Sequence, residues 1–246
     1  MKFLFHTGRY FSLLWMILHR PERASIYRRQ IIIEMDNIGI DSLGIVAIIS
    51  VFMGAVVAIQ TAFNTDHPLL PNYAIGFATR QAIILEFSPT VISLILAGKA
   101  GSRIASEIGT MRVTEQIDAL EIMGVNAAGF LILPKIIASM IILPFLVIIS
   151  IFLGIAGGWT ASALTGVVPL NNFTYGLTFE FSSFDIYYAL IKSVVFAFII
   201  ASVSGYYGFY TRGGSLDVGQ SSTKAVVFSS IHIIAFNLIL TQILLV

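Results

Sequence analysis

Five long apolar stretches follow one another along the chain, separated by polar or charged segments. They cover residues 43–63, 81–101, 131–165, 186–208 and 225–245. A helix rises about 1.5 Å per residue, so roughly 20 apolar residues are enough to cross the hydrocarbon core of a bilayer. The pattern therefore predicts an all-α integral membrane protein with about five transmembrane helices, in which residues 43–246 form a single five-span domain.

The first 42 residues precede these stretches and read as a separate surface segment. Residues 3–19 are apolar and aromatic, but Arg9 interrupts them and Arg20-Pro21 ends them, which leaves about ten continuous apolar residues, too few to span a bilayer. A secretory signal sequence is the alternative, but Arg, Pro and Glu follow where a small-residue cleavage site would be needed. We expect an N-terminal interfacial helix here, and a second surface segment over residues 22–42.

The composition supports a membrane-embedded chain. Hydrophobic residues make up 57% of the 246 positions and charged residues only 11%, and the mean hydropathy is +0.90. This leaves too little polar surface to cover a water-soluble globule. The net charge of +1 gives no indication of nucleic acid binding, and the absence of cysteine excludes disulfides, thiolate metal sites and thiol nucleophiles.

Lysine and arginine are distributed unevenly about the five predicted spans. Twelve of the fourteen fall in the N-terminal segment (six), in the region from Lys99 to Lys135 (four) and at Arg212 and Lys224 between the last two spans. Arg80 stands alone on the opposite side, and Lys192 lies inside the fourth span. Because basic residues gather on the cytoplasmic side, we expect the N-terminus, residues 102–128 and residues 209–224 to be cytoplasmic and the C-terminus to face outward.

The connection between the second and third spans, residues 102–128, is longer than a loop needs. A few residues would join two antiparallel helices, yet this stretch is long, polar and helix-favouring, and proline is absent from it. Thr110 can cap a helix N-terminus after Gly109, and Gly124 suits the left-handed position at a helix C-terminus. We expect a cytoplasmic helix pair or one bent helix, with an apolar face and an acidic face.

The same segment carries a long ungapped run of residues that resembles a known family. The run comprises AGKAGS at residues 97–102, EIGTMRVTEQIDAL at 107–120 and MGV at 123–125. It is similar to the MlaE family of ABC-transporter permeases, which are membrane subunits of lipid transporters that work with MCE-domain proteins. Looser similarity extends from about residue 30 to the C-terminus, and includes Glu86-x-x-Pro89 in the second span.

The resemblance implies a homodimeric permease of the bacterial inner membrane that moves phospholipid to or from a periplasmic MCE protein. Its cytoplasmic coupling helix would dock on a separate ABC ATPase, which binds the ATP and Mg²⁺. The resemblance leaves open the lipid headgroup, the direction of transport and whether a small cytoplasmic accessory subunit joins. On this interpretation the ATPase contacts come from the polar residues Glu107, Arg112, Glu115 and Asp118 and from the apolar residues Val113, Ile117 and Leu120.

The residues themselves agree that any ATP chemistry lies elsewhere. The pair Gly98-Lys99 lacks the upstream glycine of a phosphate-binding loop and follows a membrane span instead of a strand. Four scattered histidines show no metal-ligand spacing. We therefore expect a transport subunit without catalytic residues, metal site or cofactor of its own.

Two ionisable residues, Glu86 and Lys192, lie within the predicted spans. Charges at membrane depth are costly, which makes both of them candidate substrate-cavity residues. On one interpretation, the two residues form an ion pair or line an outward-facing lipid cavity. On the other, Lys192 extends to the interface and Glu86 reaches water near Arg80. Family permeases often carry an arginine before this glutamate, whereas this chain has Leu85, so a headgroup contact by that arginine is not expected.

Other patterns bear on packing and on competing functions. Gly154 and Gly158 have the GxxxG spacing that allows close helix approach, and a dimer contact is one use of it. A proton-coupled secondary transporter of an amphiphile, with Glu86 and Lys192 as its relay, is the main alternative function. A membrane-embedded lipid-modifying enzyme is a weaker one, because it needs a nucleophile or metal site that the sequence does not show.

Overall fold

The computed structural model describes residues 2–19, 24–65, 71–166 and 168–245. Within these ranges almost every residue is helical and there is no strand, which confirms the all-α prediction. Five helical runs are long and apolar enough to cross a membrane, namely Tyr27–Asn64, Tyr73–Val113, Ala127–Thr165, Ser183–Phe209 and Ser215–Leu245. Each of them contains one predicted span, so the prediction of five transmembrane helices is confirmed.

The first two runs are built from several helices that continue into one another. The first consists of α2 (Ala24–Met35), the π-helix η1 (Asp36–Ile40) and α3 (Asp41–Asn64). The second consists of α4 (Tyr73–Ala82), the π-helix η2 (Ile83–Val91), α5 (Ile92–Leu96), the π-helix η3 (Ala97–Gly101) and α6 (Ser102–Val113). The predicted boundary at residue 42 therefore does not coincide with a break in the helix.

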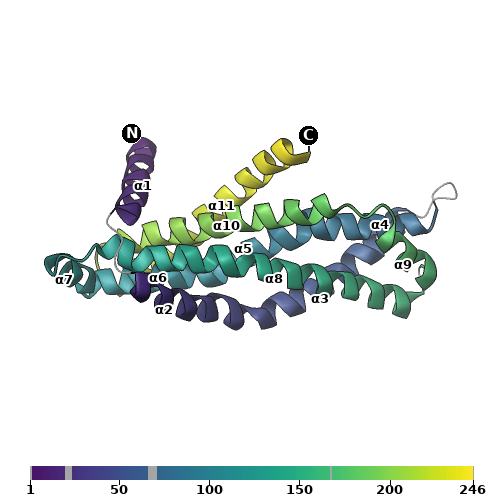
Figure 1. Ribbon diagram of the computed structural model, residues 1–246, viewed down its shortest axis with the longest axis horizontal. Coiled ribbons are helices and arrows are strands. Elements are labelled where there is room, and N and C mark those ends of the chain that lie inside the picture. Colours follow the sequence, from purple (N-terminus) through teal and green to yellow (C-terminus); the bar gives the residue numbers. More distant parts are fainter. Residues whose placement is uncertain (1, 20–23, 66–70, 167, 246) are drawn as a thin grey trace.

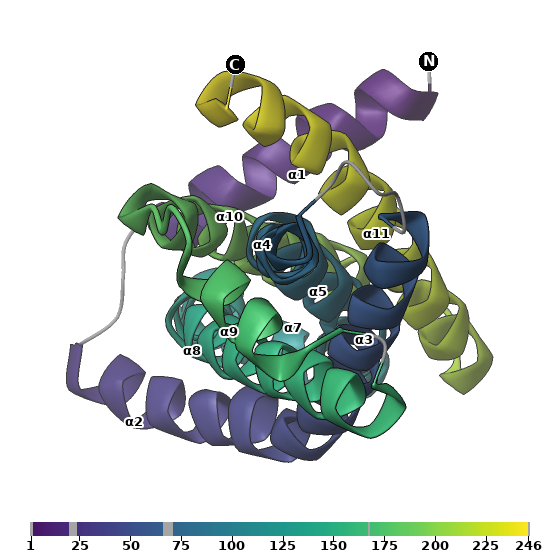
Figure 2. The same cartoon turned by 90° about the vertical axis from the view of Figure 1, so that its right-hand side faces the viewer.

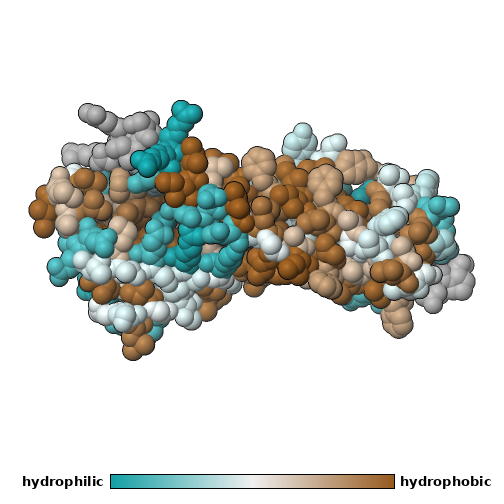
Figure 3. All heavy atoms as spheres, turned by 90° about the horizontal axis from the view of Figure 1, so that it is seen from below, coloured by the Kyte–Doolittle hydropathy of each residue, from teal (hydrophilic) through white to brown (hydrophobic). Residues whose placement is uncertain are grey.

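The remaining runs are single helices, and three shorter helices lie outside the runs. The single helices are α8 (Ala127–Thr165), α10 (Ser183–Phe209) and α11 (Ser215–Leu245). The shorter ones are α1 (Lys2–Leu18), α7 (Gln116–Ile122) and α9 (Leu170–Thr178). The runs lie along one long axis, with α4 and α9 at one end and α6 and α7 at the other (Figure 1). Hydrophobic residues gather across the middle of this axis and hydrophilic ones toward its ends (Figure 3).

Helix α1 crosses the bundle axis at the α7 end, as Figures 1 and 2 show from two directions. It buries Leu13 and Ile17 and exposes the large apolar residues Leu4, Phe5, Phe11, Trp15 and Leu18. The Tyr10 hydroxyl and Ser202 Oγ are 2.7 Å apart, which ties α1 to α10. Burial raises the pKa of Tyr10 more than this hydrogen bond lowers it, so the hydroxyl stays protonated at neutral pH. An amphipathic helix across the axis has the geometry expected of the interfacial helix.

Helices α3 and α8 approach each other so closely that only glycine fits between them. A Cβ atom on Gly54 would lie 1.8 Å from the carbonyl oxygen of Gly154, and one on Gly157 would lie 2.1 Å from that of Val51. The GxxxG glycines at 154 and 158 both face α3. The predicted close approach is therefore confirmed, but it occurs within one chain, and the option of a dimer contact at these glycines is not supported.

One expectation for residues 102–128 needs correction. Thr110 lies inside α6 and is not a helix cap, because α6 simply continues the second run beyond the apolar stretch. Within it Ile104, Ala105, Ile108 and Gly109 are buried. The expected helix pair is present as α6 and α7, and Gly124 does adopt the left-handed conformation after α7, with φ of 80°.

Candidate functional site

Three helices bring polar side chains together at membrane depth. Each contributes two residues spaced four apart, so that both point from the same face of an otherwise apolar helix. The pairs are Glu86 and Thr90 on η2, Tyr188 and Lys192 on α10, and Asn237 and Thr241 on α11. We call these six residues the intramembrane polar cluster.

Lys192 is the buried centre of the intramembrane polar cluster. Its side chain is fully buried, and Nζ donates to Glu86 Oε2 at 2.9 Å, to the Leu85 carbonyl at 3.1 Å and to Thr241 Oγ1 at 3.4 Å. A carbonyl oxygen has two lone pairs, so that of Leu85 can accept from Lys192 in addition to a backbone N–H. Nζ also lies 4.7 Å from the centre of the Tyr188 ring.

Glu86 occupies the open side of the same cluster. Its side chain is 47% exposed, whereas that of Lys192 is 0% exposed. Glu86 Oε1 accepts from the Asn237 amide and from Thr90 Oγ1, the latter at 3.1 Å. The Tyr188 hydroxyl lies 2.8 Å from Thr241 Oγ1. Each partner of this ion pair thus has neutral hydrogen-bonding neighbours. An ion pair in apolar surroundings requires such additional hydrogen bonds to offset the loss of hydration.

These contacts decide between the two interpretations of the charged residues. The predicted ion pair between Glu86 and Lys192 is present, and Lys192 does not extend to the interface. Arg80 does not mark a hydrated interface beside Glu86, because its side chain is buried, with 1% of the residue exposed. Its guanidinium donates to the carbonyls of Leu177 and Phe179 at the end of α9. The role of Glu86 and Lys192 in a substrate cavity stays a prediction.

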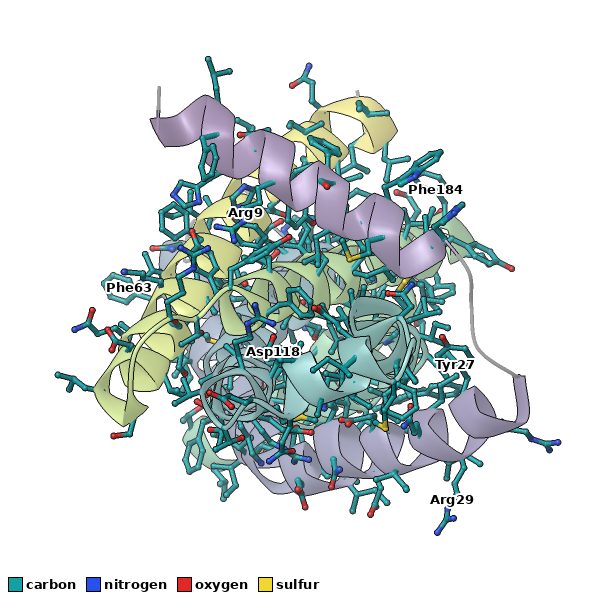
Figure 4. All side chains as sticks on the ribbon, turned by 90° about the vertical axis from the view of Figure 1, so that its left-hand side faces the viewer. Arg9, Tyr27, Arg29, Phe63, Asp118 and Phe184 are labelled. Carbon is teal, nitrogen blue, oxygen red and sulfur yellow. The ribbon has the colours of Figure 1, made fainter. Side chains whose placement is uncertain are left out.

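The turn between α6 and α7 holds several of the predicted coupling residues. Arg112 Nη1 and Asp118 Oδ1 are 2.7 Å apart across this turn, and Glu115 lies between them with a φ of 61°, a left-handed conformation that is uncommon outside glycine. The Arg112 guanidinium also lies 5.7 Å from the centre of the Phe209 ring. Figure 4 views this end of the bundle and shows Asp118 near its centre, while Arg29 of α2 points away from the bundle.

The apolar part of the predicted coupling face needs correction. Ile117 is fully buried and packs in the core of the chain with Leu13 and Ile17 of α1, so it has no surface to offer a partner. Val113 and Leu120 are partly exposed. Sequence reasoning missed Ile122 and Met123, which are 87% and 69% exposed at the end of α7. Two large apolar residues directly before the helix-ending glycine were the available signal.

Glu107 is held by an ion-pair network inside the chain. Lys135 of α8 is 3% exposed, and its Nζ lies 2.8 Å from Glu107 Oε2 and 2.5 Å from Glu34 Oε1 of α2. A neighbouring pair joins Arg103 of α6 to Asp41 at the start of α3, at 3.2 Å. Helix α6, which leads to α7, is therefore attached by charges to both the first and the third run.

Five apolar helical runs, with a buried ion pair inside them, define a multi-pass helical membrane protein. The family model described as "Permease MlaE" matches residues 31–243, and the chain belongs to this permease family. It is 38% identical over 224 residues to a "Probable ABC transporter permease protein" of Rickettsia bellii, covering 89% of this chain and 85% of the relative. A probable ABC transporter permease protein of Synechocystis is 34% identical over 219 residues, covering 89% and 83%.

A plant relative is also similar over most of this chain. The chloroplastic protein TRIGALACTOSYLDIACYLGLYCEROL 1 of Arabidopsis thaliana is 34% identical over 226 residues, which cover 92% of this chain and 64% of that protein. The similarity thus extends to bacterial, cyanobacterial and plant proteins.

Proposed function

We propose that this chain is the permease subunit of an ATP-driven ABC transporter that moves phospholipid between the inner membrane and a periplasmic MCE protein. The observation that carries the proposal is the family match over residues 31–243, which overlaps all five runs and includes the α6–α7 turn. The bacterial relatives named as probable ABC transporter permeases support it. On this proposal ATP and Mg²⁺ are bound by a separate ATPase subunit.

The surface of the bundle suits an amphiphilic cargo. Large apolar side chains are exposed along the spans, among them Phe52, Phe145 and Phe152. Such a surface contacts acyl chains better than ions or sugars. A phospholipid also needs a place for its polar headgroup, and the half-exposed Glu86 lies within the second run. We also propose that two copies of the chain assemble as a homodimer around the cargo.

The charge distribution supports an orientation in which the α7 end is cytoplasmic. Arg103, Arg112 and Lys135 all belong to this end, whereas Arg80 lies near the end formed by α4 and α9. By the positive-inside rule the N-terminus is then cytoplasmic and the C-terminus periplasmic. The exposed apolar face of α1 would rest in the cytoplasmic leaflet.

The ATPase would engage the tip of α7 in this arrangement. Glu115 is exposed in the turn, and Ile122 and Met123 project from the other end of α7. An apolar pair beside acidic residues fits a partner groove with an apolar floor and a basic rim. The Arg112–Asp118 pair fixes the angle of α7 to α6, so that force on α7 would reach the second run.

The test is affinity purification of the full-length chain with its partners from native membranes in mild detergent. We expect the wild-type chain to recover an ABC ATPase, an MCE protein and phospholipid. Ile122→Glu should lower ATPase recovery at least about tenfold, because it places a charge in an apolar contact. Leu216→Glu is the matched control, since Leu216 is an exposed apolar residue at the start of α11.

Each outcome of this purification separates the alternatives. Equal ATPase recovery with Ile122→Glu and wild type would refute the docking surface. If no ATPase accompanies the wild-type chain, and lipid movement instead depends on the proton gradient, the secondary transporter becomes the better account of the Glu86–Lys192 pair.

A further inference from the structure

One asparagine joins the interfacial helix α1 to the beginning of α8. Asn126 is the N-cap residue of α8, where its Oδ1 accepts from the Gly129 N–H at 3.2 Å. Its Nδ2 donates to the backbone carbonyls of Met16 and His19 at the end of α1, both at 2.7 Å. A side-chain amide carries two N–H donors and one carbonyl oxygen. Asn126 therefore gives both of its donors to α1 and its acceptor to α8.

The end of α1 needs donors from elsewhere in the chain. The last four carbonyls of a helix have no N–H partner within the helix, and α1 ends at Leu18. The beginning of α8 lies directly against this end, because a Cβ atom on Gly129 would lie 3.2 Å from the carbonyl oxygen of Ile17. The negative end of one helix dipole thus faces the positive end of another. Hydrogen bonds and charge both hold α1 at this junction.

Asn126 also follows closely after the exposed tip of α7. It lies three positions beyond Met123, which is 69% exposed. The residues between them form a Schellman motif, in which the Val125 N–H donates to the Leu120 carbonyl at 3.0 Å and Gly124 has the required left-handed φ of 80°. A displacement of the α7 tip therefore reaches Asn126 through a hydrogen-bonded turn and not through a flexible loop.

The other half of α1 is attached to a different element. The Tyr10 hydroxyl lies 2.7 Å from Ser202 Oγ, and His6 Nδ1 lies 2.8 Å from the Tyr206 hydroxyl. Both partners belong to α10. Helix α1 is thus tied to α10 by its N-terminal half and to the start of α8 by its C-terminal end. A movement of the α7 tip relative to α10 would turn α1 about its N-terminal half.

We propose that Asn126 is a positioning residue that makes α1 move with the tip of α7 during the ATPase cycle. This inference deepens the proposed function, because it rests on an ATPase that engages α7 and on a cytoplasmic leaflet around α1. The exposed apolar side chains of α1, including Trp15 at 74% exposed, then shift within that leaflet each time the ATPase moves α7. ATP hydrolysis thereby displaces lipid beside the bundle as well as the spans themselves.

A nitroxide spin label at position 15 measures the depth of α1 in the membrane. The chain contains no cysteine, so Trp15→Cys creates one labelling site in it. The full-length chain is purified with its native partners, labelled and placed in lipid nanodiscs. The depth follows from the accessibility of the nitroxide to oxygen and to a water-soluble nickel chelate, without nucleotide and after trapping with ATP, Mg²⁺ and orthovanadate. Label on the partner subunits is measured on a complex that keeps Trp15, and is subtracted.

With Asn126 unchanged, we expect the label to change depth by about 2 Å or more on trapping, the size usual for helix shifts in such transitions. Asn126→Asp should abolish this shift. An aspartate still caps α8 through a side-chain oxygen but has no N–H donor for α1. Asn126→Ser is a second variant, because it also keeps a capping oxygen, lacks the amide and adds no charge. It should abolish the shift as well.

Two control variants separate this link from a general loosening of α1. Tyr10→Phe is the matched control, because it removes a hydrogen bond between α1 and α10 and leaves Asn126 in place. It should keep the nucleotide-dependent shift. Asn171→Asp introduces the same charge at an exposed position of α9, at the other end of the bundle, and should also keep the shift.

Failure of the inference and failure of the proposed function give different results. A shift of unchanged size in both Asn126 variants would overturn the role of Asn126, and so would its loss in Tyr10→Phe. An absent shift with Asn126 unchanged, although orthovanadate stops ATP hydrolysis by the complex, would overturn the movement of α1 and leave the permease function intact. If no ATPase accompanied the chain, the proposed function itself would fall.

Discussion

Removing the cation of the Lys135 network should destabilise the protein in a graded way. Lys135 is almost fully buried, Glu34 is 13% exposed and Glu107 is 45% exposed. Removing one partner of a buried ion pair costs about 3–5 kcal/mol, whereas a pair with a largely solvated partner is worth about 1 kcal/mol or less. We therefore expect Lys135→Met to cost about 3 kcal/mol, Glu34→Gln less than that, and Glu107→Gln about 1 kcal/mol.

The measurement is thermal unfolding of the purified variants in one detergent. For a chain of this size about 1 kcal/mol corresponds to roughly 2–4 °C, so Lys135→Met should lower the Tm by roughly 10 °C and Glu107→Gln by only a few degrees. Lys224→Met is the control, because Lys224 is exposed on α11 and its removal should leave the Tm nearly unchanged. Equal shifts for Lys135→Met and Lys224→Met would refute the reasoning from burial.

Two further predictions concern packing. Gly157→Ala should force α3 and α8 apart and cost about 2 kcal/mol or more, because its Cβ would lie 2.1 Å from a backbone carbonyl. Gly219→Ala is the control and should be tolerated, since nothing lies within 4 Å of its Cβ position. The same unfolding assay checks both variants, and equal Tm values would contradict the close contact. Arg80→Met should release the carbonyls at the end of α9, so that hydrogen exchange of the α9 amides rises about tenfold, and unchanged exchange would count against Arg80 as the anchor of this helix.

The spans could be placed from the sequence because their length and apolar character are imposed by the bilayer. The sequence could not show which element packs on the apolar face of each helix. The periodicity correctly placed Ile117 on an apolar face of the α7 segment, but that face turns inward, into the core cluster of the chain itself. Periodicity alone does not distinguish a face that meets a partner from one that meets the chain itself.

The same limit applies to pairing between helices. The spacing of Gly154 and Gly158 predicted a close approach, yet only the structure shows that the partner is α3 of the same chain. The spacing of four between Asn237 and Thr241 is visible in the sequence, but their contacts with Glu86 and Lys192 join three separate runs. The α9 helix was missed within a loop because it is short, and its position depends on the distant Arg80.

The second run, Tyr73–Val113, has a mechanical consequence. Its 41 residues form a rod about 60 Å long at the usual rise per residue. Glu86 lies in the interior of this rod, and the turn at Glu115 lies directly beyond its end. A torque applied at the turn would therefore arrive at the carboxylate without passing through any loop. The rod should bend most readily at the π-helical stretches η2 and η3. There each carbonyl pairs with the N–H five residues on, instead of four as in an α-helix.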